Sequence, residues 1–219
     1  MLGPSRRDYE NLYAALQESI DGLKSSYPLD YQKIDIKSSL LVDQLPYFTG
    51  SKLADVGSNF GMYSILSSRF ALQVFAIERS RQSHEVARAA VAFFKENHYS
   101  LTNLSLKNLA VSALDAVDYD ALLLSLVLYH LSNDEVDGLV EDARKKCERM
   151  IIQCRPGRAI KYETGALTDH VSRNTRFDGC YDIAGCVKFM REVGMSEIEI
   201  KVDSRLYGGE VFPVLLGKR

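Results

Sequence analysis

A glycine turn between an apolar run and a helical pattern is the stretch of the sequence best suited to chemistry. The run 52–56 leads directly into Gly57, and Gly61 follows four residues later. Gly57 allows a sharp turn and a close approach of a ligand to the backbone. Amides exposed at the start of the following helix can meet a polar or anionic group. The pattern predicts a nucleotide-type binding site formed by Asp55, Gly57, Ser58, Asn59 and Gly61.

An acidic residue closes the next apolar run. Glu78 follows the run 73–77, roughly 20 residues after Gly57, where an acid can accept hydrogen bonds from both hydroxyls of a ribose. A dinucleotide fingerprint requires glycine at position 59, to make room for a pyrophosphate, and this chain has Asn59 there. The pattern therefore favours a ligand that carries ribose and adenine but no phosphate.

A second group of candidates follows the apolar run 120–127. Ser125, Tyr129 and His130 lie where this run ends, and α/β folds bind ligands beyond the carboxyl ends of their strands. His130 is the best candidate for a general base because its ordinary pKa is near neutrality. Packing against the next helix is the alternative role for His130. Tyr129 is either a second catalytic residue or a wall of the pocket.

A basic segment follows the apolar run 149–154. Between Arg155 and Asp178 it contains five basic and three acidic residues. Arginine pairs with carboxylate and phosphate groups through two parallel hydrogen bonds. The segment is therefore either the binding site of an anionic substrate or a solvated loop, and the candidate substrate-binding residues are Arg155, Arg158, Arg173 and Arg176.

The remaining pattern predicts the elements that position these residues. Strands are expected at 52–56, 73–77, 104–111, 120–127 and 149–154, alternating with helices at 61–70, 81–97, 134–147 and 181–193. Two further strands, 196–202 and 210–216, flank Tyr207, Gly208 and Gly209 as an antiparallel hairpin. The order predicts an α/β fold: a three-layer sandwich around a mostly parallel seven-stranded sheet that ends in an antiparallel hairpin.

Composition excludes several classes of protein. The 219 residues are 46% hydrophobic and 26% charged, with a net charge of −2, which is typical of a soluble globular chain and disfavours a surface built for nucleic acid. Neither a membrane span nor a secretory signal is visible, so a cytoplasmic location is expected. The four cysteines form no CxxC pair, so we expect reduced thiols and no metal site. Apolar residues at helical spacing in 9–23, and a second helix at 36–45, predict an accessory lid within residues 1–48, followed by a domain at 49–219.

Taken together, the motifs resemble those of the class I S-adenosylmethionine-dependent methyltransferases over roughly residues 50–217. In that family an acid and a glycine-rich turn, matched here by 55–61, precede an acid that closes the second strand, matched by Glu78. The resemblance implies a Rossmann-like fold with the last strand inserted antiparallel, and S-adenosylmethionine as the methyl donor with S-adenosylhomocysteine as product. It also implies that adenine and the donor methyl are contacted by Asn108, Leu109, Ala110 and Ser125. Asn59 and Asn108 depart from the family's usual residues.

The resulting hypothesis is methyl transfer to an oxygen or nitrogen of a small-molecule acceptor, with an anionic acceptor suggested by the arginines. One alternative is a methyltransferase for RNA or protein that uses the basic segment. Another is a non-catalytic protein that binds the donor or a partner and forms a homodimer through its N-terminal helices. A nicotinamide-dependent oxidoreductase is disfavoured by Asn59.

Overall fold

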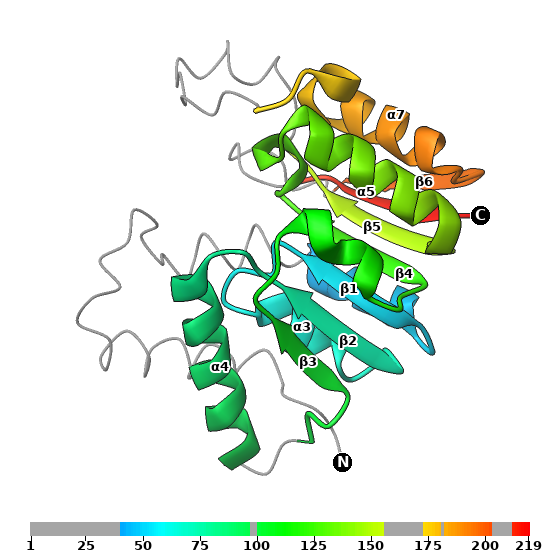
Figure 1. The fold of residues 1–219 in the computed structure, drawn as a ribbon. Coiled ribbons are helices and arrows are strands. Elements are labelled where there is room, and N and C mark those ends of the chain that lie inside the picture. The colour runs from blue at the N-terminus through cyan, green and yellow to red at the C-terminus, as the bar shows by residue number, and fades with distance from the viewer. Residues whose placement is uncertain (1–39, 97–99, 156–172, 181, 203–211) are drawn as a thin grey trace, which may run out of the picture.

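A seven-stranded sheet forms the centre of the molecule (Figure 1). The computed structural model describes residues 40–96, 100–155, 173–180, 182–202 and 212–219. The strand order is β3-β2-β1-β4-β5-β7-β6, in which only the pairs β5–β7 and β6–β7 are antiparallel. The strands are β1 (Lys52–Val56), β2 (Gln73–Ile77), β3 (Leu104–Lys107), β4 (Ala121–Ser125), β5 (Arg149–Gln153), β6 (Glu197–Lys201) and β7 (Val214–Lys218).

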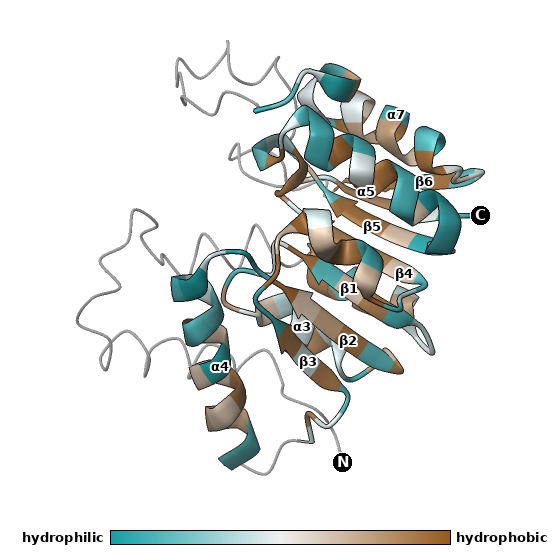
Figure 2. Ribbon diagram, viewed as in Figure 1, coloured by the Kyte–Doolittle hydropathy of each residue, from teal (hydrophilic) through white to brown (hydrophobic). Residues whose placement is uncertain are grey.

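The strands at the centre of the sheet carry apolar residues on both faces, and brown is the main colour along them in Figure 2, with teal interruptions. One face carries Ala54, Leu122 and Ile152 into the larger core cluster, and the other carries Leu53, Leu123 and Ile151 into a second cluster. A sheet buried on both faces requires a helical layer on each side.

Helices cover both faces. α5 (Asn133–Lys146), α7 (Ile183–Val193) and the 3-10 helix η2 (Val111–Ala116) pack on the first face, and Figure 1 shows α5 and α7 side by side. α3 (Met62–Ser67) packs on the second face, and α4 (Arg81–Glu96) packs against α3 and the β3 edge. The predicted three-layer Rossmann-like sandwich is confirmed, including the antiparallel insertion of β7 between β5 and β6.

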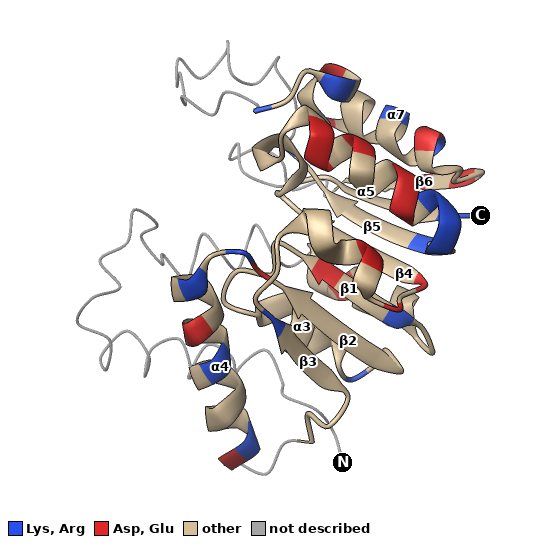
Figure 3. Cartoon of the chain, viewed as in Figure 1, with Lys and Arg blue, Asp and Glu red and all other residues tan. Residues whose placement is uncertain are grey.

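Local sequence signals determine where the helices of the first face begin and end. Ser132 caps α5 in a capping box with Glu135, and Asp182 caps α7 through the Gly185 amide. Gly194 ends α7 with a φ of 101°. In Figure 3, α5 is acidic in its first turn and basic in its last turn, which complements the helix dipole.

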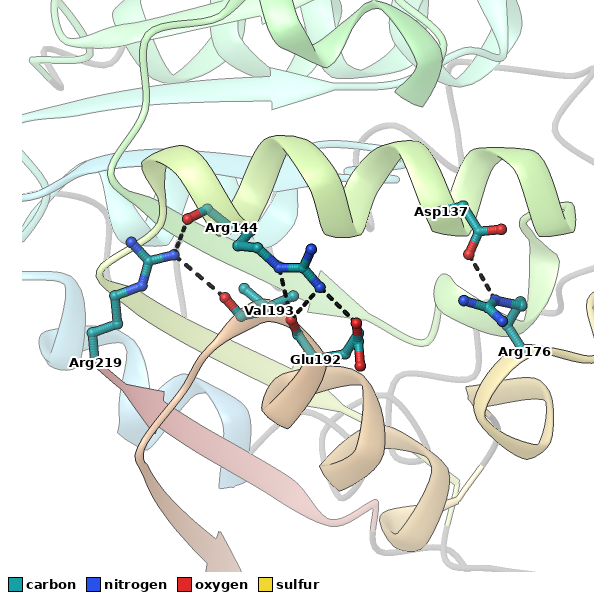
Figure 4. Close-up of polar contacts among 6 residues, drawn as sticks. All are labelled: Asp137, Arg144, Arg176, Glu192, Val193 and Arg219. Atoms are coloured by element: carbon teal, nitrogen blue, oxygen red, sulfur yellow. Dashed lines mark hydrogen bonds and ion pairs between the residues drawn. The ribbon is translucent and has the colours of Figure 1, made fainter.

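Arginine side chains tie the C-terminal ends of α5 and α7 together (Figure 4). Arg144 pairs with Glu192 at 2.6 Å and also donates to the Glu192 backbone oxygen. Arg219, directly after β7, donates to the carbonyl oxygens of Ala143, Arg144 and Val193. The carbonyl oxygens of Arg144, Glu192 and Val193 lie in the last turns of α5 and α7, where such groups lack an amide partner further along the helix, while that of Ala143 also accepts the Cys147 amide.

Several predicted boundaries are wrong by a few residues. The third strand ends at Lys107 instead of Val111, because Asn108 turns its amide to the end of β2 and 111–116 forms a 3-10 helix. The helix after the glycine turn is Met62–Ser67, shorter than the predicted 61–70, and the last strand is Val214–Lys218 instead of 210–216. The predicted helix at 9–23 and the turn at 207–209 lie outside the described residues.

The end of the predicted accessory segment belongs to the core. Residues 40–44 are helical and continue into the 3-10 helix η1 (Leu45–Phe48), and Leu41, Leu45 and Phe48 are fully buried against the second face of the sheet. Tyr47 also donates its hydroxyl to the Gly217 carbonyl at 3.0 Å. The domain boundary at residue 48 stays a prediction.

Within the described ranges, every helix is too short or too polar to span a bilayer. The same part of the chain contains no cluster of three or more His, Cys, Asp or Glu side chains arranged to hold a metal ion.

Candidate functional site

The backbone of the glycine turn has positive φ angles, which residues other than glycine rarely adopt. Gly57 has a φ of 71°, Asn59 of 50° and Gly61 of 80°. A Cβ on Gly57 would lie 2.5 Å from the Cγ2 atom of Val127, and one on Gly61 would lie 3.3 Å from the Cβ of Ala87. Gly57 is therefore required both by its backbone angles and by the close approach of the segment after β4.

Glu78 connects the glycine turn to the end of β2. One carboxylate oxygen accepts the Asn59 amide at 2.9 Å, and the other accepts the Ser80 amide at 2.7 Å. The amides of Gly57 and Ser58 both donate to the Ile77 carbonyl. A carboxylate has about four acceptor positions, so a half-buried Glu78 that uses two of them retains acceptors for two ligand hydroxyls.

Asp55 lies beneath the turn. Its side chain is 1% exposed and accepts the Ser64 hydroxyl of α3 at 2.5 Å. Burial raises the pKa of Asp55 to about 7, the Ser64 hydrogen bond opposes that rise, and the charge of Glu78 adds to it. Asp55 therefore supports the turn from within the fold, and its direct contact with a ligand stays a prediction. The hydroxyl of Ser58 is buried as well.

The segment after β3 lies against the end of β2. The Asn108 side-chain amide donates to the carbonyl oxygens of Glu78 at 2.8 Å and Arg79 at 3.2 Å. These two bonds orient Asn108 and leave its own side-chain carbonyl as an acceptor. Leu109 packs against the core, and Ala110 immediately precedes η2. Asn108, Leu109 and Ala110, which are predicted to contact adenine, thus form the segment that lies next to Glu78 at the end of β2.

The segment after β4 contains the catalytic candidates. Ser125 donates its hydroxyl to the Gln153 side chain at 2.7 Å, and Leu126 has a left-handed φ of 54°. The 3-10 turn η3 (Leu128–His130) comes next, with Tyr129 buried and its ring centroid 4.3 Å from that of the half-buried His130. Because β1 and β4 are neighbours in the sheet, this turn and the glycine turn meet at the switch point of the strand order.

Arg155 is positioned by two aromatic rings. Its guanidinium carbon lies 5.7 Å from the Tyr129 ring centroid and 5.1 Å from that of Phe212, within the range of cation–π attraction. Its Nη2 donates to the Tyr129 hydroxyl at 3.3 Å. Among the described residues, its buried Nε finds no acceptor. A cation thus lies directly beside Tyr129.

The other arginine candidates differ in their surroundings. Arg173 donates its backbone amide to the Tyr129 carbonyl at 2.8 Å, and its side chain is exposed. Arg176 pairs with Asp137 of α5 at 2.7 Å (Figure 4) and lies over the Phe177 ring at 5.2 Å. Arg158 lies outside the described residues. The structure therefore brings Arg155 and Arg173 to the segment of His130, while Arg176 is committed to an ion pair on the helix surface.

Three residues of this region have no counterpart among the sequence candidates. Val127 packs on Gly57, Phe212 stacks on Arg155, and Asn174 bonds to the turn of His130. Val127 ends the apolar run 120–127 but carries no polar group that would mark it, and Asn174 and Phe212 belong to no motif. Only the sheet order brings 127, 174 and 212 to the same edge.

The strand order, with β7 inserted antiparallel beside β5, and the glycine turn at its switch point are features of the class I methyltransferase fold. No family model and no curated protein sequence matches the chain.

Solved structures with this fold match nearly the whole chain. Magnesium protoporphyrin IX methyltransferase from Synechocystis PCC 6803 with bound SAH is 16% identical, with a TM-score of 0.62, and the match covers 97% of each chain. A putative O-methyltransferase from Nostoc punctiforme PCC 73102 is 14% identical, with a TM-score of 0.64 over 96% of this chain and 68% of the other. The methyltransferase domain of bacterial CtHen1 is 13% identical, with a TM-score of 0.62 over 85% of this chain and 100% of that domain. At these identities the likeness concerns the fold.

Proposed function

We propose that this protein is an S-adenosylmethionine-dependent methyltransferase that acts on a small-molecule acceptor. The observation that carries the proposal is the Glu78 carboxylate, which spans the glycine turn and the end of β2 and retains acceptors at the switch point of the sheet. The similar structure from Synechocystis was solved both with SAH and with SAM bound, which supports the same donor here.

The residues present fit such a donor. Glu78 would accept the ribose hydroxyls, the glycine turn would admit the methionine portion beside its backbone, and Asn108, Leu109 and Ala110 would border the adenine. When bound, the donor supplies an electrophilic methyl group. The chain's task is to hold the acceptor in line with that methyl and to exclude water.

His130 is proposed to orient or deprotonate the acceptor. It is half-buried, stacks at an angle on the buried Tyr129 and follows the strand next to the glycine turn. Imidazole can accept a proton near neutral pH. A general base is needed only if the acceptor is protonated at the working pH, so His130→Ala is expected to slow turnover while leaving donor affinity nearly intact.

The acceptor is proposed to be anionic because Arg155 places a fixed cation beside Tyr129. That cation would repel a second positive charge and attract a carboxylate or phosphate. Arg173 is proposed to assist with its exposed side chain. Arg176 is a weaker candidate for the same role because Asp137 already neutralises it.

A parallel titration with S-adenosylmethionine, S-adenosylhomocysteine and NAD tests the donor, read by calorimetry and thermal shift. A ligand at 100 times its dissociation constant stabilises a fold by about 2.7 kcal/mol. Stabilisation by the two sulfur ligands and none by NAD is expected. Stabilisation by NAD alone would instead support an oxidoreductase, and the absence of any response would refute a donor-binding role.

Labelled S-adenosylmethionine then tests the acceptor, with a panel of small carboxylic acids, phosphate esters and their neutral analogues. Methyl transfer restricted to the anionic members, and lost in Arg155→Ala, is the expected result. Arg144→Ala is the matched control, because Arg144 pairs with Glu192 and carries the same charge away from the site. Equal transfer to neutral analogues would refute the anionic acceptor without refuting methyl transfer.

A further inference from the structure

Three consecutive residues of the segment before α7 are bonded to the turn that carries His130 or to the start of α5, which follows it. Arg173 donates its amide to the Tyr129 carbonyl at 2.8 Å, and Thr175 donates its amide to the Asn133 side chain at 2.9 Å. Between them, the side-chain amide of Asn174 donates to the carbonyl oxygens of Leu128 at 2.9 Å and Leu131 at 3.0 Å. Asn174 thus holds both ends of the turn that contains Tyr129 and His130.

The environment of Asn174 makes these two bonds strong determinants of position. Its side chain is 4% exposed, so water cannot easily replace the Asn174 amide as the hydrogen-bond donor to the two carbonyl groups. A buried hydrogen bond that loses its donor leaves an acceptor unsatisfied, which costs more than the bond itself contributes. The turn therefore has one preferred position as long as the Asn174 amide is present.

The same turn needs such a restraint, because the residues just before it are strained and tightly packed. Leu126 adopts a left-handed φ of 54°, which persists only where the surrounding structure fixes it. Val127 lies against Gly57 with no room for a Cβ. The segment is thus held by the glycine turn on one side and by Asn174 on the other.

We infer that Asn174 is a positioning residue: its side-chain amide fixes the 128–131 turn, so that Val127 keeps its place against the glycine turn of the proposed donor pocket and His130 keeps its place on the proposed acceptor side. This inference rests on the proposed function. Without the amide, the turn samples other positions, and the apparent affinity for a donor-site ligand is the intrinsic affinity multiplied by the fraction of time the competent position is occupied.

The chain offers a matched control. Asn103, before β3, also uses its side-chain amide to bond two carbonyl oxygens, those of Ser68 at 3.0 Å and Ala71 at 2.9 Å. Those carbonyls follow α3 at the other end of the β1–β2 pair, away from His130. Asn103→Ala therefore removes two hydrogen bonds of the same kind without changing any contact of the 128–131 turn.

Two measurements on the full chain test the inference. Calorimetry measures the binding of S-adenosylhomocysteine, and proton NMR measures the imidazole resonances. The His130 resonance is assigned as the one that is missing from the His130→Ala spectrum. Asn174→Ala is expected to weaken binding about tenfold and to move the His130 resonance. Asn103→Ala is expected to bind within about twofold of the unaltered chain and to leave that resonance in place. Asn174→Asp, which keeps the side-chain shape, is the second variant. Its protonated form restores one donor, so at low pH its His130 resonance should approach that of the unaltered chain recorded at the same pH.

Unchanged affinity and an unchanged His130 resonance in both Asn174 variants would overturn the inference. An equal loss of affinity in Asn103→Ala would overturn it as well, because general destabilisation would then explain the effect. If the unaltered chain does not bind S-adenosylhomocysteine, the proposed function fails, while the resonance of His130 still tests the positioning role.

Discussion

Replacing Gly57 by alanine measures how tightly the segment after β4 is fitted to the glycine turn. A left-handed φ costs a residue with a Cβ roughly 1–2 kcal/mol. The new Cβ would also lie 2.5 Å from Cγ2 and 3.0 Å from Cβ of Val127. Val127 is β-branched and stiff at χ1 and follows the strained Leu126, so it cannot turn aside cheaply. Overpacking of this kind adds about 1–3 kcal/mol.

Gly50→Ala separates the two contributions. Gly50 has a similar φ of 77°, but a Cβ there meets no atom within 4 Å. It should cost only the conformational part, roughly 1–2 kcal/mol, while Gly57→Ala should cost about 2–5 kcal/mol. Urea unfolding of the ligand-free chain measures both changes, because the free energy of unfolding falls linearly with denaturant.

Val127→Ala completes the comparison. The double variant Gly57→Ala with Val127→Ala removes the 2.5 Å contact but keeps the 3.0 Å one, so about 1–2 kcal/mol of the added cost should be recovered as a coupling energy. A cost at Gly57 no larger than at Gly50, or no coupling with Val127, would refute the close fit of the two turns.

Three further predictions concern Asp55 and Glu78 at the glycine turn and Arg219 at the ends of α5 and α7. Burial raises the pKa of Asp55 to about 7 from an ordinary 3.8, so folding favours its protonated form. The free energy of unfolding should therefore fall as the pH rises through that interval. Urea unfolding at several pH values measures this slope, which Asp55→Asn should flatten. Glu78→Ala should weaken S-adenosylhomocysteine binding by tenfold to hundredfold, since hydrogen bonds to a charged group contribute about 1.5–3 kcal/mol; Glu85→Ala, an exposed glutamate of α4 paired with Arg88, is its calorimetric control, and equal affinity in both variants would contradict the ribose role. Arg219→Ala should lower the unfolding free energy by about 1–3 kcal/mol with donor affinity unchanged, and an unchanged melting temperature would show that its three carbonyl contacts add nothing.

The periodicity of the apolar residues, together with the residues that end each run, was sufficient to predict most of the fold. The boundaries of β1 and β2 were predicted correctly because each is a buried run ended by Gly57 or Glu78, and Gly194 marked the end of α7. The third strand was predicted too long because 108–111 is apolar enough to continue it. Only the Asn108 side chain, bonded to the end of β2, explains why pairing stops at Lys107.

The candidate site was predictable only in part. Gly57 and Glu78 were recognisable in the sequence as a turn glycine and as the acid that ends β2, and the structure joins them through the glycine turn. The contact of Glu78 with a ribose stays a prediction. The sequence favours Arg155 among the arginines because it directly follows a predicted strand, but only the structure shows that Arg155 lies beside Tyr129 while Arg176 pairs with Asp137. Asn174 carried no signal, because its partners are backbone carbonyls, which any sequence supplies.

The antiparallel insertion of β7 also governs how the chain can assemble. β5 pairs with β4 on one side and with β7 on the other, so while the chain emerges from the ribosome the outer edge of β5 stays unpaired until Val214–Lys218 has been made. An open, apolar edge invites pairing with another molecule. β7 then closes that edge, receives the Tyr47 hydroxyl at Gly217 and brings Arg219 to the ends of α5 and α7. β7 thus completes the sheet, and a chain that lacks it is expected to aggregate more readily because the edge of β5 is left open.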